Sequence, residues 1–252
     1  MKICIVYYIY INPNANWKCI IRAQLQDLKN VGLFHIATVH CVICGETQLI
    51  EECKNFINEP KLMYSSTRIN NYEYPGLLKL YQLGKENPET LFLYMHTKGM
   101  VFSNTGERNK TELRILRETI KHHHYIFRVF QNNKDIDKAG LFPDHSGIIW
   151  YNFFWVRGNF FENLIEPIIT SDRYYYEHKY IRGGSCFNLL TFDKTTVDIY
   201  FAIRNTFANC KGLFNGKKYL NKYPDLAKNG ITTKNAYNHF IKYGINEERN
   251  LL

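Results

Sequence analysis

Short apolar runs alternate with amphipathic stretches through the first part of the chain. The apolar runs have the length and composition of buried strands and lie at residues 3–10, 36–44, 61–65 and 91–95. The stretches between them repeat apolar side chains with a helical period and lie at residues 17–30, 47–56 and 74–86. Strands that alternate with helices in this way form mostly parallel, doubly wound sheets. We therefore predict an α/β fold.

The rest of the chain is less regular. Residues 110–132 predict one long helix, the aromatic run at 148–156 follows a polar loop, and helical patterns return at 159–164 and 171–180. The long helix carries His122, His123 and His124. Consecutive residues of a helix point in different directions, so these three imidazoles cannot converge on one metal ion. We expect structural or surface roles for them.

Composition excludes several classes of protein. A chain of 252 residues with 45% hydrophobic and 15% aromatic residues has the apolar content of a folded globular protein. Its apolar runs are too short to span a bilayer, and the first one lacks a signal-peptide cleavage site. The seven cysteines are scattered through apolar segments, and the pair Cys41 and Cys44 has no second pair to complete a zinc site. We expect reduced thiols and a cytoplasmic protein.

The net charge of +9 raises the alternative of a nucleic-acid-binding protein. However, the lysines and arginines are spread along the chain, with no basic run and no glycine-aromatic RNA-binding signature. The same charge suits a protein that binds a small anionic ligand. We therefore expect no nucleic-acid partner.

The apolar run at 91–95 ends in a polar, basic corner formed by His96, Thr97, Lys98 and Gly99. Ligands of open α/β sheets bind at the carboxyl ends of the central strands. An imidazole, a hydroxyl and an ammonium beside a glycine suit an anion, above all a phosphate; the alternative is a strand end with a solvated lysine. No G-x-G-x-x-G or P-loop motif follows the first strand, which disfavours dinucleotide oxidoreductases and P-loop NTPases.

Four segments carry a resemblance to a known family. YMHTKG (94–99), NFFWVR (152–157), RYYYE (173–177) and YEYPGL (72–77) are similar to the YLHTKG, GNFWWAR, R-x-x-x-E and EYEYPTL segments of a glycosyltransferase-like family of bacteria and large DNA viruses. The matches run in order over roughly residues 2–190. Two departures affect the acceptor side: Tyr151 stands where that family usually has glycine, and Lys179 where it often has tryptophan.

The resemblance implies a GT-A fold and a nucleotide-sugar donor, with a UDP-sugar favoured because UDP is the commonest donor nucleotide of this fold. A viral member would act in the host cytoplasm. Such folds usually hold a Mn²⁺ or Mg²⁺ ion with a D-x-D motif after the fourth strand, but this chain has His96, Thr97 and Lys98 there. Our hypothesis is that Lys98 and His96 bind the donor diphosphate and partly replace the metal, which an aspartate elsewhere could still hold.

In this interpretation the nucleoside lies at the end of the first strand. Tyr8, Ile9 and Tyr10 would supply stacking surface and backbone groups, Asn12 an amide, and Tyr74 a further contact. Each of these tyrosines could equally belong to the core.

Transfer to a hydroxyl of a glycan or protein acceptor, with inversion, requires a carboxylate base. Glu177 is the first candidate, and the alternative for it is a surface ion pair with Arg173. Asp144 is the reserve candidate. Asn152, Trp155 and Arg173 would form the acceptor side, whereas Phe153 and Phe154 are core candidates.

The segments at 214–226 and 236–244 resemble a short helical module, YLxxYPDL…AxxHYxxYGxxEGR, that is appended to many glycosyltransferases. We predict a GT-A-like domain at residues 1–210 and a helical module at 211–252 that packs against it. A non-catalytic nucleotide- or glycan-binding module of the same fold is the main alternative to an enzyme.

Overall fold

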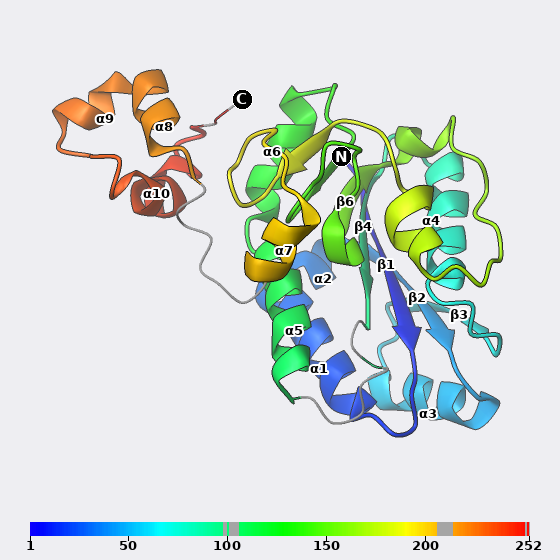
Figure 1. Cartoon of the computed structure of the whole chain (residues 1–252). Helices are drawn as coiled ribbons and strands as arrows, with labels where there is room; N and C mark the ends of the chain where they lie inside the picture. Colours follow the sequence, from blue (N-terminus) through cyan, green and yellow to red (C-terminus); the bar gives the residue numbers. More distant parts are fainter. Residues whose placement is uncertain (98–99, 101–105, 206–213, 250, 252) are drawn as a thin grey trace.

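The computed structural model describes residues 1–97, 100, 106–205, 214–249 and 251 and contains one sheet flanked by helices (Figure 1). The strands are β1 (Ile3–Tyr10), β2 (Thr38–Cys44), β3 (Leu62–Thr67), β4 (Leu91–His96), β5 (Lys138–Gly140), β6 (Phe154–Arg157) and β7 (Cys186–Asn188). The helices before residue 133 are α1 (Trp17–Asn30), α2 (Leu33–Ile36), α3 (Thr47–Ile57), α4 (Tyr74–Glu86), α5 (Gly106–Ile120) and α6 (His123–Asn132). The later ones are η1 (Trp150–Asn152), η2 (Gly158–Phe161), η3 (Tyr175–Tyr180), α7 (Ile199–Asn205), α8 (Gly216–Lys222), α9 (Pro224–Lys228), α10 (Ala236–His239) and η5 (Phe240–Gly244).

The seven strands are ordered β3-β2-β1-β4-β6-β5-β7. Strands β3, β2, β1 and β4 run parallel, and only β6 runs against its two neighbours. This mostly parallel sheet with helices on both faces confirms the predicted fold class. Because the chain continues from β1 to β2 on one side and returns to β4 on the other, the order of strands reverses between β1 and β4. Crevices at such a reversal are where open α/β sheets bind ligands.

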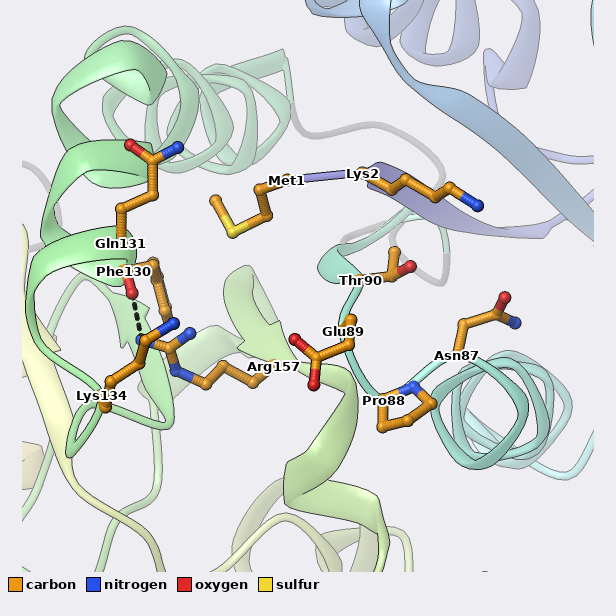
Figure 2. Close-up of a pocket in the computed structure, with 10 residues that line it drawn as sticks. All are labelled: Met1, Lys2, Asn87, Pro88, Glu89, Thr90, Phe130, Gln131, Lys134 and Arg157. Atoms are coloured by element: carbon orange, nitrogen blue, oxygen red, sulfur yellow. Dashed lines mark hydrogen bonds between the residues drawn. The ribbon is translucent and has the colours of Figure 1, made fainter.

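The ends of the strands define two opposite sides of the sheet, which we call the carboxyl edge and the amino edge. The carboxyl edge contains the last residues of β1, β2, β3 and β4. It also contains the first residue of β6, because β6 runs antiparallel to β4. At the amino edge, Leu91 is paired with both Ile3 and Arg157. A cavity of about 540 Å³ lies at this amino edge (Figure 2).

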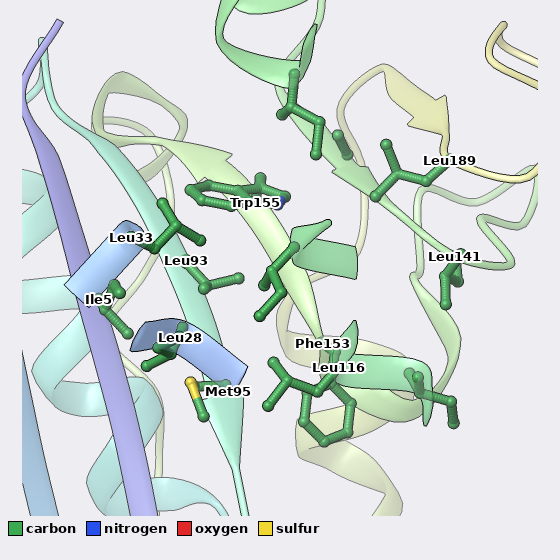
Figure 3. Close-up of a cluster of buried hydrophobic side chains, with 14 of the residues drawn as sticks. Ile5, Leu28, Leu33, Leu93, Met95, Leu116, Leu141, Phe153, Trp155 and Leu189 are labelled. Carbon is green, nitrogen blue, oxygen red and sulfur yellow. The ribbon is translucent and has the colours of Figure 1, made fainter. Parts of the chain in front are cut away.

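Two apolar clusters cover the two faces of the sheet. Alternate residues of a strand point to opposite faces, so Ile5, Tyr7 and Ile9 join the larger cluster under α1, α3, α5 and α6. Figure 3 shows Trp155, Leu93 and Met95 in this cluster beside Leu28 and Leu116. The smaller cluster lies under α4 and contains Val6, Tyr8 and Tyr94.

Local signals explain where the predicted helices begin and end. The side chain of Asn16 accepts a hydrogen bond of 3.3 Å from the Cys19 amide at the start of α1. Gly32 follows that helix with a φ of 79°, a left-handed conformation that glycine adopts easily. Pro75 lies in the first turn of α4, as predicted.

The helix predicted at residues 110–132 is in fact two helices, α5 and α6, separated at Lys121 and His122. The Nε1–H of Trp155 donates a hydrogen bond of 3.0 Å to the carbonyl of Thr119. In a continuous helix that carbonyl would accept the amide of His123. The Trp155 side chain therefore provides the hydrogen-bond donor for the Thr119 carbonyl at the point where the helix is interrupted.

Two further helical predictions need correction in type. Residues 159–164 contribute only to the 3₁₀ turn η2, and within residues 171–180 the regular part is the π-helix η3. The predicted strand at 36–44 begins at Thr38, because Leu33–Ile36 forms the short helix α2.

The C-terminal helices contact the α/β sheet domain through aromatic rings. The ring of Phe240 lies 4.7 Å from that of Phe192 and 5.7 Å from that of Tyr125, centroid to centroid. A side chain of α6, Arg128, also donates to the carbonyl of Ile245. These C-terminal helices therefore pack against α6 and Phe192, while the predicted domain boundary at residues 210 and 211 lies outside the described residues.

Candidate functional site

The end of β1 and the end of β4 are joined by one side chain at the carboxyl edge. The Thr97 hydroxyl donates to the carbonyl of Tyr10 at 3.0 Å and accepts from the amide of Tyr10 at 2.9 Å. The Thr97 amide donates to the carbonyl of Tyr8 at 3.0 Å. Nearby, the Asn12 amide group donates to the carbonyl of Met100 at 2.9 Å. The predicted donor-binding segments after β1 and β4 therefore meet.

The predicted donor-binding residues differ in accessibility. Ile9 is fully buried and Tyr8 is 3% exposed, so their side chains belong to the two apolar clusters and offer no stacking surface. Tyr10 and Asn12 are partly exposed. Lys98, on which the predicted diphosphate contact depends, lies outside the described residues.

A buried polar cluster lies next to this junction and consists of Glu73, Tyr94, His96 and Asn152. Oε2 of Glu73 accepts from the Asn152 amide group at 2.9 Å and from the Tyr94 hydroxyl at 3.3 Å. Oε1 of Glu73 lies 3.7 Å from Nδ1 of His96. Burial raises the pKa of Tyr94 well above its ordinary value, and the Glu73 carboxylate adds to this effect. Tyr94 is therefore a neutral hydrogen-bond donor to Glu73.

The His96 ring is oriented from both sides. Its Nε2 lies 3.1 Å from the carbonyl of Tyr151, which can only accept, so Nε2 carries a proton. Its face stacks on Tyr94 at 5.9 Å and lies 4.9 Å from Phe153. On its other side, Nδ1 faces the Glu73 carboxylate. These contacts hold the ring in one orientation within the cluster.

The backbone around the polar cluster is strained. Tyr72, Tyr151 and Asn152 have φ values of 52°, 73° and 54°, in the left-handed region that non-glycine residues seldom occupy. Such conformations persist only where the surroundings hold them, and they concentrate at functional sites. A glycine would adopt the φ value of Tyr151 without strain. Here the tyrosine ring packs 6.0 Å from Phe142.

The cluster is held close to the sheet by α4. A Cβ atom added to Gly76 would lie 2.6 Å from Cβ of Tyr8 and 2.9 Å from the Tyr94 hydroxyl. Only glycine lets the first turn of α4 approach β1 and β4 this closely. This approach brings Glu73, the residue before α4, into contact with Tyr94.

Glu177 lies on η3, and its carboxylate is 25% exposed. Its Oε2 is 3.9 Å from Nε2 of His178. The adjacent residue, Tyr176, accepts a hydrogen bond of 3.3 Å from Asn152 through its carbonyl, which places η3 against the polar cluster. Arg173 precedes η3, is exposed, and lies over the ring of Tyr174 at 4.7 Å.

Two predicted site residues turn out to be structural. Trp155 is fully buried in the larger apolar cluster, so its ring cannot form a wall that an acceptor reaches. Asp144 is 7% exposed. Its Oδ1 accepts hydrogen bonds from Ser146 N and Oγ and from Ile148 N, at 2.8, 2.8 and 3.0 Å. These bonds shape the loop before β6, so Asp144 is unsuited to act as an acceptor base. Asn152, predicted on the acceptor side, is 1% exposed and belongs to the polar cluster.

Glu73 was not predicted as a site residue. It lies within YEYPGL, but an acidic residue ahead of a helix usually serves as a cap. The structure shows no side-chain cap hydrogen bond from Glu73 to α4. The sequence signal for Glu73 was its position between two tyrosines, directly before the Tyr-Pro pair that begins α4.

A cavity of about 280 Å³ opens between the ends of β2 and β3 and helix α4. Its lining includes the hydroxyl groups of Ser65, Ser66 and Thr67, together with Tyr74, Lys79 and Ile169. Tyr74 therefore lines a hollow next to α4, and its predicted contact with the nucleotide stays a prediction.

The described residues do not fit a divalent cation. Within the described ranges, no three His, Cys, Asp or Glu side chains lie close enough together to hold a metal. At the end of β4, where the resembling fold family has its acidic ligands, the Thr97 hydroxyl is engaged with Tyr10. Likewise, no described helix has both the length and the apolar character needed to cross a bilayer.

No protein-family model matches the chain, and no curated protein matches it. Among solved structures, the chain is similar to a protein from Desulfovibrio desulfuricans G20 described as a candidate nucleotide-diphospho-sugar transferase. The two share 13% sequence identity with a TM-score of 0.38, over 83% of this chain and 89% of the other.

Proposed function

We propose that this chain is a glycosyltransferase that uses a nucleotide-sugar, most favourably a UDP-sugar, to modify a glycan or protein hydroxyl. The observation that carries the proposal is the polar cluster of Glu73, Tyr94, His96 and Asn152, which lies beside the junction of β1 and β4 where the strand order reverses. The resemblance of the YMHTKG, YEYPGL, NFFWVR and RYYYE segments to the glycosyltransferase-like family supports it, because these segments supply the cluster and η3.

In the proposed reaction the donor diphosphate lies at the end of β4, where the Lys98 ammonium and the His96 ring bind it. Glu177 removes the proton from the acceptor hydroxyl while that oxygen attacks C1 of the sugar. The bond between C1 and the diphosphate oxygen breaks, and the nucleoside diphosphate leaves with the bonding electrons. Glu177 suits this role better than Glu73, because it is partly exposed whereas Glu73 is 8% exposed and bonded to the cluster. Glu73 orients His96 and Asn152.

We assign no step to a metal ion, because the described side chains at the end of β4 do not form a divalent-cation site. Donor turnover in EDTA tests this assignment. Activity that persists supports a metal-independent diphosphate site, and complete loss that manganese restores would overturn it.

A thermal-shift panel of UDP-, GDP- and dTDP-sugars tests the function itself. We expect stabilisation by one nucleotide class and slow hydrolysis of that donor, with both effects lost in His96→Ala. The matched control is His35→Ala, since His35 is exposed on α2.

A non-catalytic binding module is the second candidate, and the burial of Asp144 and Trp155 favours it because both were expected at the acceptor side. Donor-induced stabilisation without any hydrolysis or transfer would select this candidate. Salt-sensitive RNA or DNA binding without a response to sugar nucleotides would instead select the nucleic-acid alternative.

A further inference from the structure

The cavity at the amino edge lies at the other end of the strands that form the candidate site. Its lining includes Lys2 and Thr90, directly before β1 and β4, and Arg157 at the end of β6. At about 540 Å³ it has the volume of a small-molecule site. A second hollow of about 290 Å³ shares Glu89, Thr90, Lys134 and Arg157 with it, so the two adjoin.

Arg157 is held rigidly at the cavity wall. Its Nε donates to the carbonyl of Ile136 at 2.6 Å, and its Nη2 donates to the carbonyls of Asn133, at 2.8 Å, and Phe130. The guanidinium also lies over the Phe130 ring at 4.9 Å (Figure 2). These contacts fix the guanidinium without neutralising it, because three carbonyl groups carry no net charge.

In the described part of the chain no carboxylate forms an ion pair with Arg157, although Asp137, Glu89 and Asp135 stabilise its charge from farther away. Glu89 lines the same cavity but forms no ion pair with it there, and the two N–H bonds of Nη1 have no described partner. Partial burial lowers the pKa of Arg157, whereas the carboxylates of Asp137, Glu89 and Asp135 raise it. A guanidinium that is held in place and keeps N–H groups toward the cavity is suited to bind an anion there.

The rest of the lining narrows the class of anion. Figure 2 shows Lys134 beside Arg157, so two cations face one region of the cavity. Asn87, Thr90 and Gln131 add groups that hydrogen-bond hydroxyls. The volume exceeds what a lone phosphate ion needs.

We propose that this cavity binds a small organic phosphate, with Arg157 Nη1 and Lys134 Nζ on the phosphate and the polar wall on the hydroxyl-bearing remainder. This site is separate from the proposed donor site and does not depend on it.

Isothermal titration of the full chain with ribose 5-phosphate and with inorganic phosphate, at constant ionic strength, tests the proposal. We expect Lys134→Glu to weaken binding of ribose 5-phosphate by about tenfold or more. Lys234→Glu makes the same charge change on an exposed residue of the helical module and should leave the affinity unchanged. Glu89→Gln should strengthen binding, whereas Glu86→Gln, an exposed residue outside the lining, should not.

Three results would overturn the proposal. The first is a heat of titration no larger than that of an equal concentration of chloride. The second is an equal loss of affinity for ribose 5-phosphate in Lys134→Glu and Lys234→Glu. The third is an equal affinity for inorganic phosphate and ribose 5-phosphate. The last result would assign the cavity to free phosphate. Binding of ribose 5-phosphate that survives His96→Ala supports the site even if the donor panel gives no response, so the two proposals can fail separately.

Discussion

The side-chain amide of Asn152 donates a hydrogen bond of 2.9 Å to Oε2 of Glu73, across 79 residues of sequence. This contact joins the residue before α4 to the turn before β6. It holds Asn152 in a left-handed conformation and leaves the Tyr151 carbonyl facing His96. The candidate site is therefore assembled by long-range contacts between segments that have little regular structure of their own.

Removing the Glu73 carboxylate should destabilise the fold. Glu73→Ala leaves the Tyr94 hydroxyl buried without its acceptor and the Asn152 amide with only the Tyr176 carbonyl. We expect the loss of the Tyr94 acceptor to cost about 1–3 kcal/mol of unfolding free energy. Glu73→Gln keeps an acceptor oxygen and should lose less than half as much. Urea unfolding measures both variants. Glu86→Ala, at the exposed end of α4, should stay within about 0.5 kcal/mol of the parent chain. Equal stability of Glu73→Ala and Glu86→Ala would contradict the role of Glu73.

Thr97 should affect both stability and donor binding through its hydroxyl. Thr97→Val removes the group that donates to and accepts from the Tyr10 backbone, so we expect a loss of about 1–3 kcal/mol. Thr97→Ser keeps the hydroxyl and should retain most of the stability. The test is a comparison of urea midpoints and of donor-induced thermal shifts for the two variants. A serine variant no better than the valine variant would show that the hydroxyl bridge is unimportant.

The left-handed backbone at Tyr151 predicts an inverted preference between alanine and glycine. Tyr151→Gly should be more stable than Tyr151→Ala by about 1 kcal/mol, because glycine adopts a positive φ without strain. Both variants lose the same ring contacts, so their difference isolates the backbone. At Trp150, where the backbone is not left-handed, the alanine variant should be the more stable of the pair. Thermal denaturation of the four variants measures this. An alanine preference at both positions would contradict the strain.

Acid should destabilise the protein through the histidines between α5 and α6. Burial, together with the neighbouring positive groups, lowers the pKa of His122 and His123 to about 4. Because a histidine in the unfolded chain titrates near 6.5, the unfolded state binds more protons between about pH 6.5 and pH 4. The free energy of unfolding should therefore fall as pH falls through this window, by up to about 1.4 kcal/mol per histidine per pH unit.

Urea unfolding at pH 7 and pH 5 measures this slope, which His122→Asn should reduce. His35→Asn is the control, since it replaces an exposed histidine. An unchanged slope in His122→Asn, or the same reduction in His35→Asn, would count against the assignment.

Glu177→Gln should reduce glycosyl transfer by about 10²–10⁴-fold while leaving donor binding unchanged. The variant keeps the size and hydrogen-bonding capacity of the side chain but cannot accept the hydroxyl proton. Product formation and donor-induced thermal shift are measured on the same preparation. Glu166→Gln, which removes a carboxylate from the preceding loop, serves as the control. Full transfer activity in Glu177→Gln would place the base elsewhere.

The regular elements could be predicted because their signals are local. Helix α1 spans the predicted residues, since Trp17, Ile20 and Leu28 share one buried face and Asn16 provides a cap. The pattern of apolar runs likewise fixed the parallel half of the sheet. The helical module at the C-terminus packs against the sheet domain through Phe240.

The site was harder to predict because its chemistry depends on which face of a strand a residue occupies. Trp155 and Phe154 are neighbours in an aromatic run, and only the pairing of Leu93 with Trp155 assigns Trp155 to the core under α5. The interruption after α5 is likewise invisible in the sequence, since it involves Thr119 and a tryptophan 36 residues later. Glu73 was overlooked because its partners are remote in sequence.

Strands β1 and β4 have the Thr97 bridge at one extremity and Lys2 and Thr90 at the other. The six residues of β4 span about 20 Å, too far for occupants of the two extremities to touch. Strand β1 is also hydrogen-bonded to β2, and β4 to β6, so neither strand can slide without breaking those ladders. Two ligands at opposite ends of the same central strands would therefore occupy independent sites.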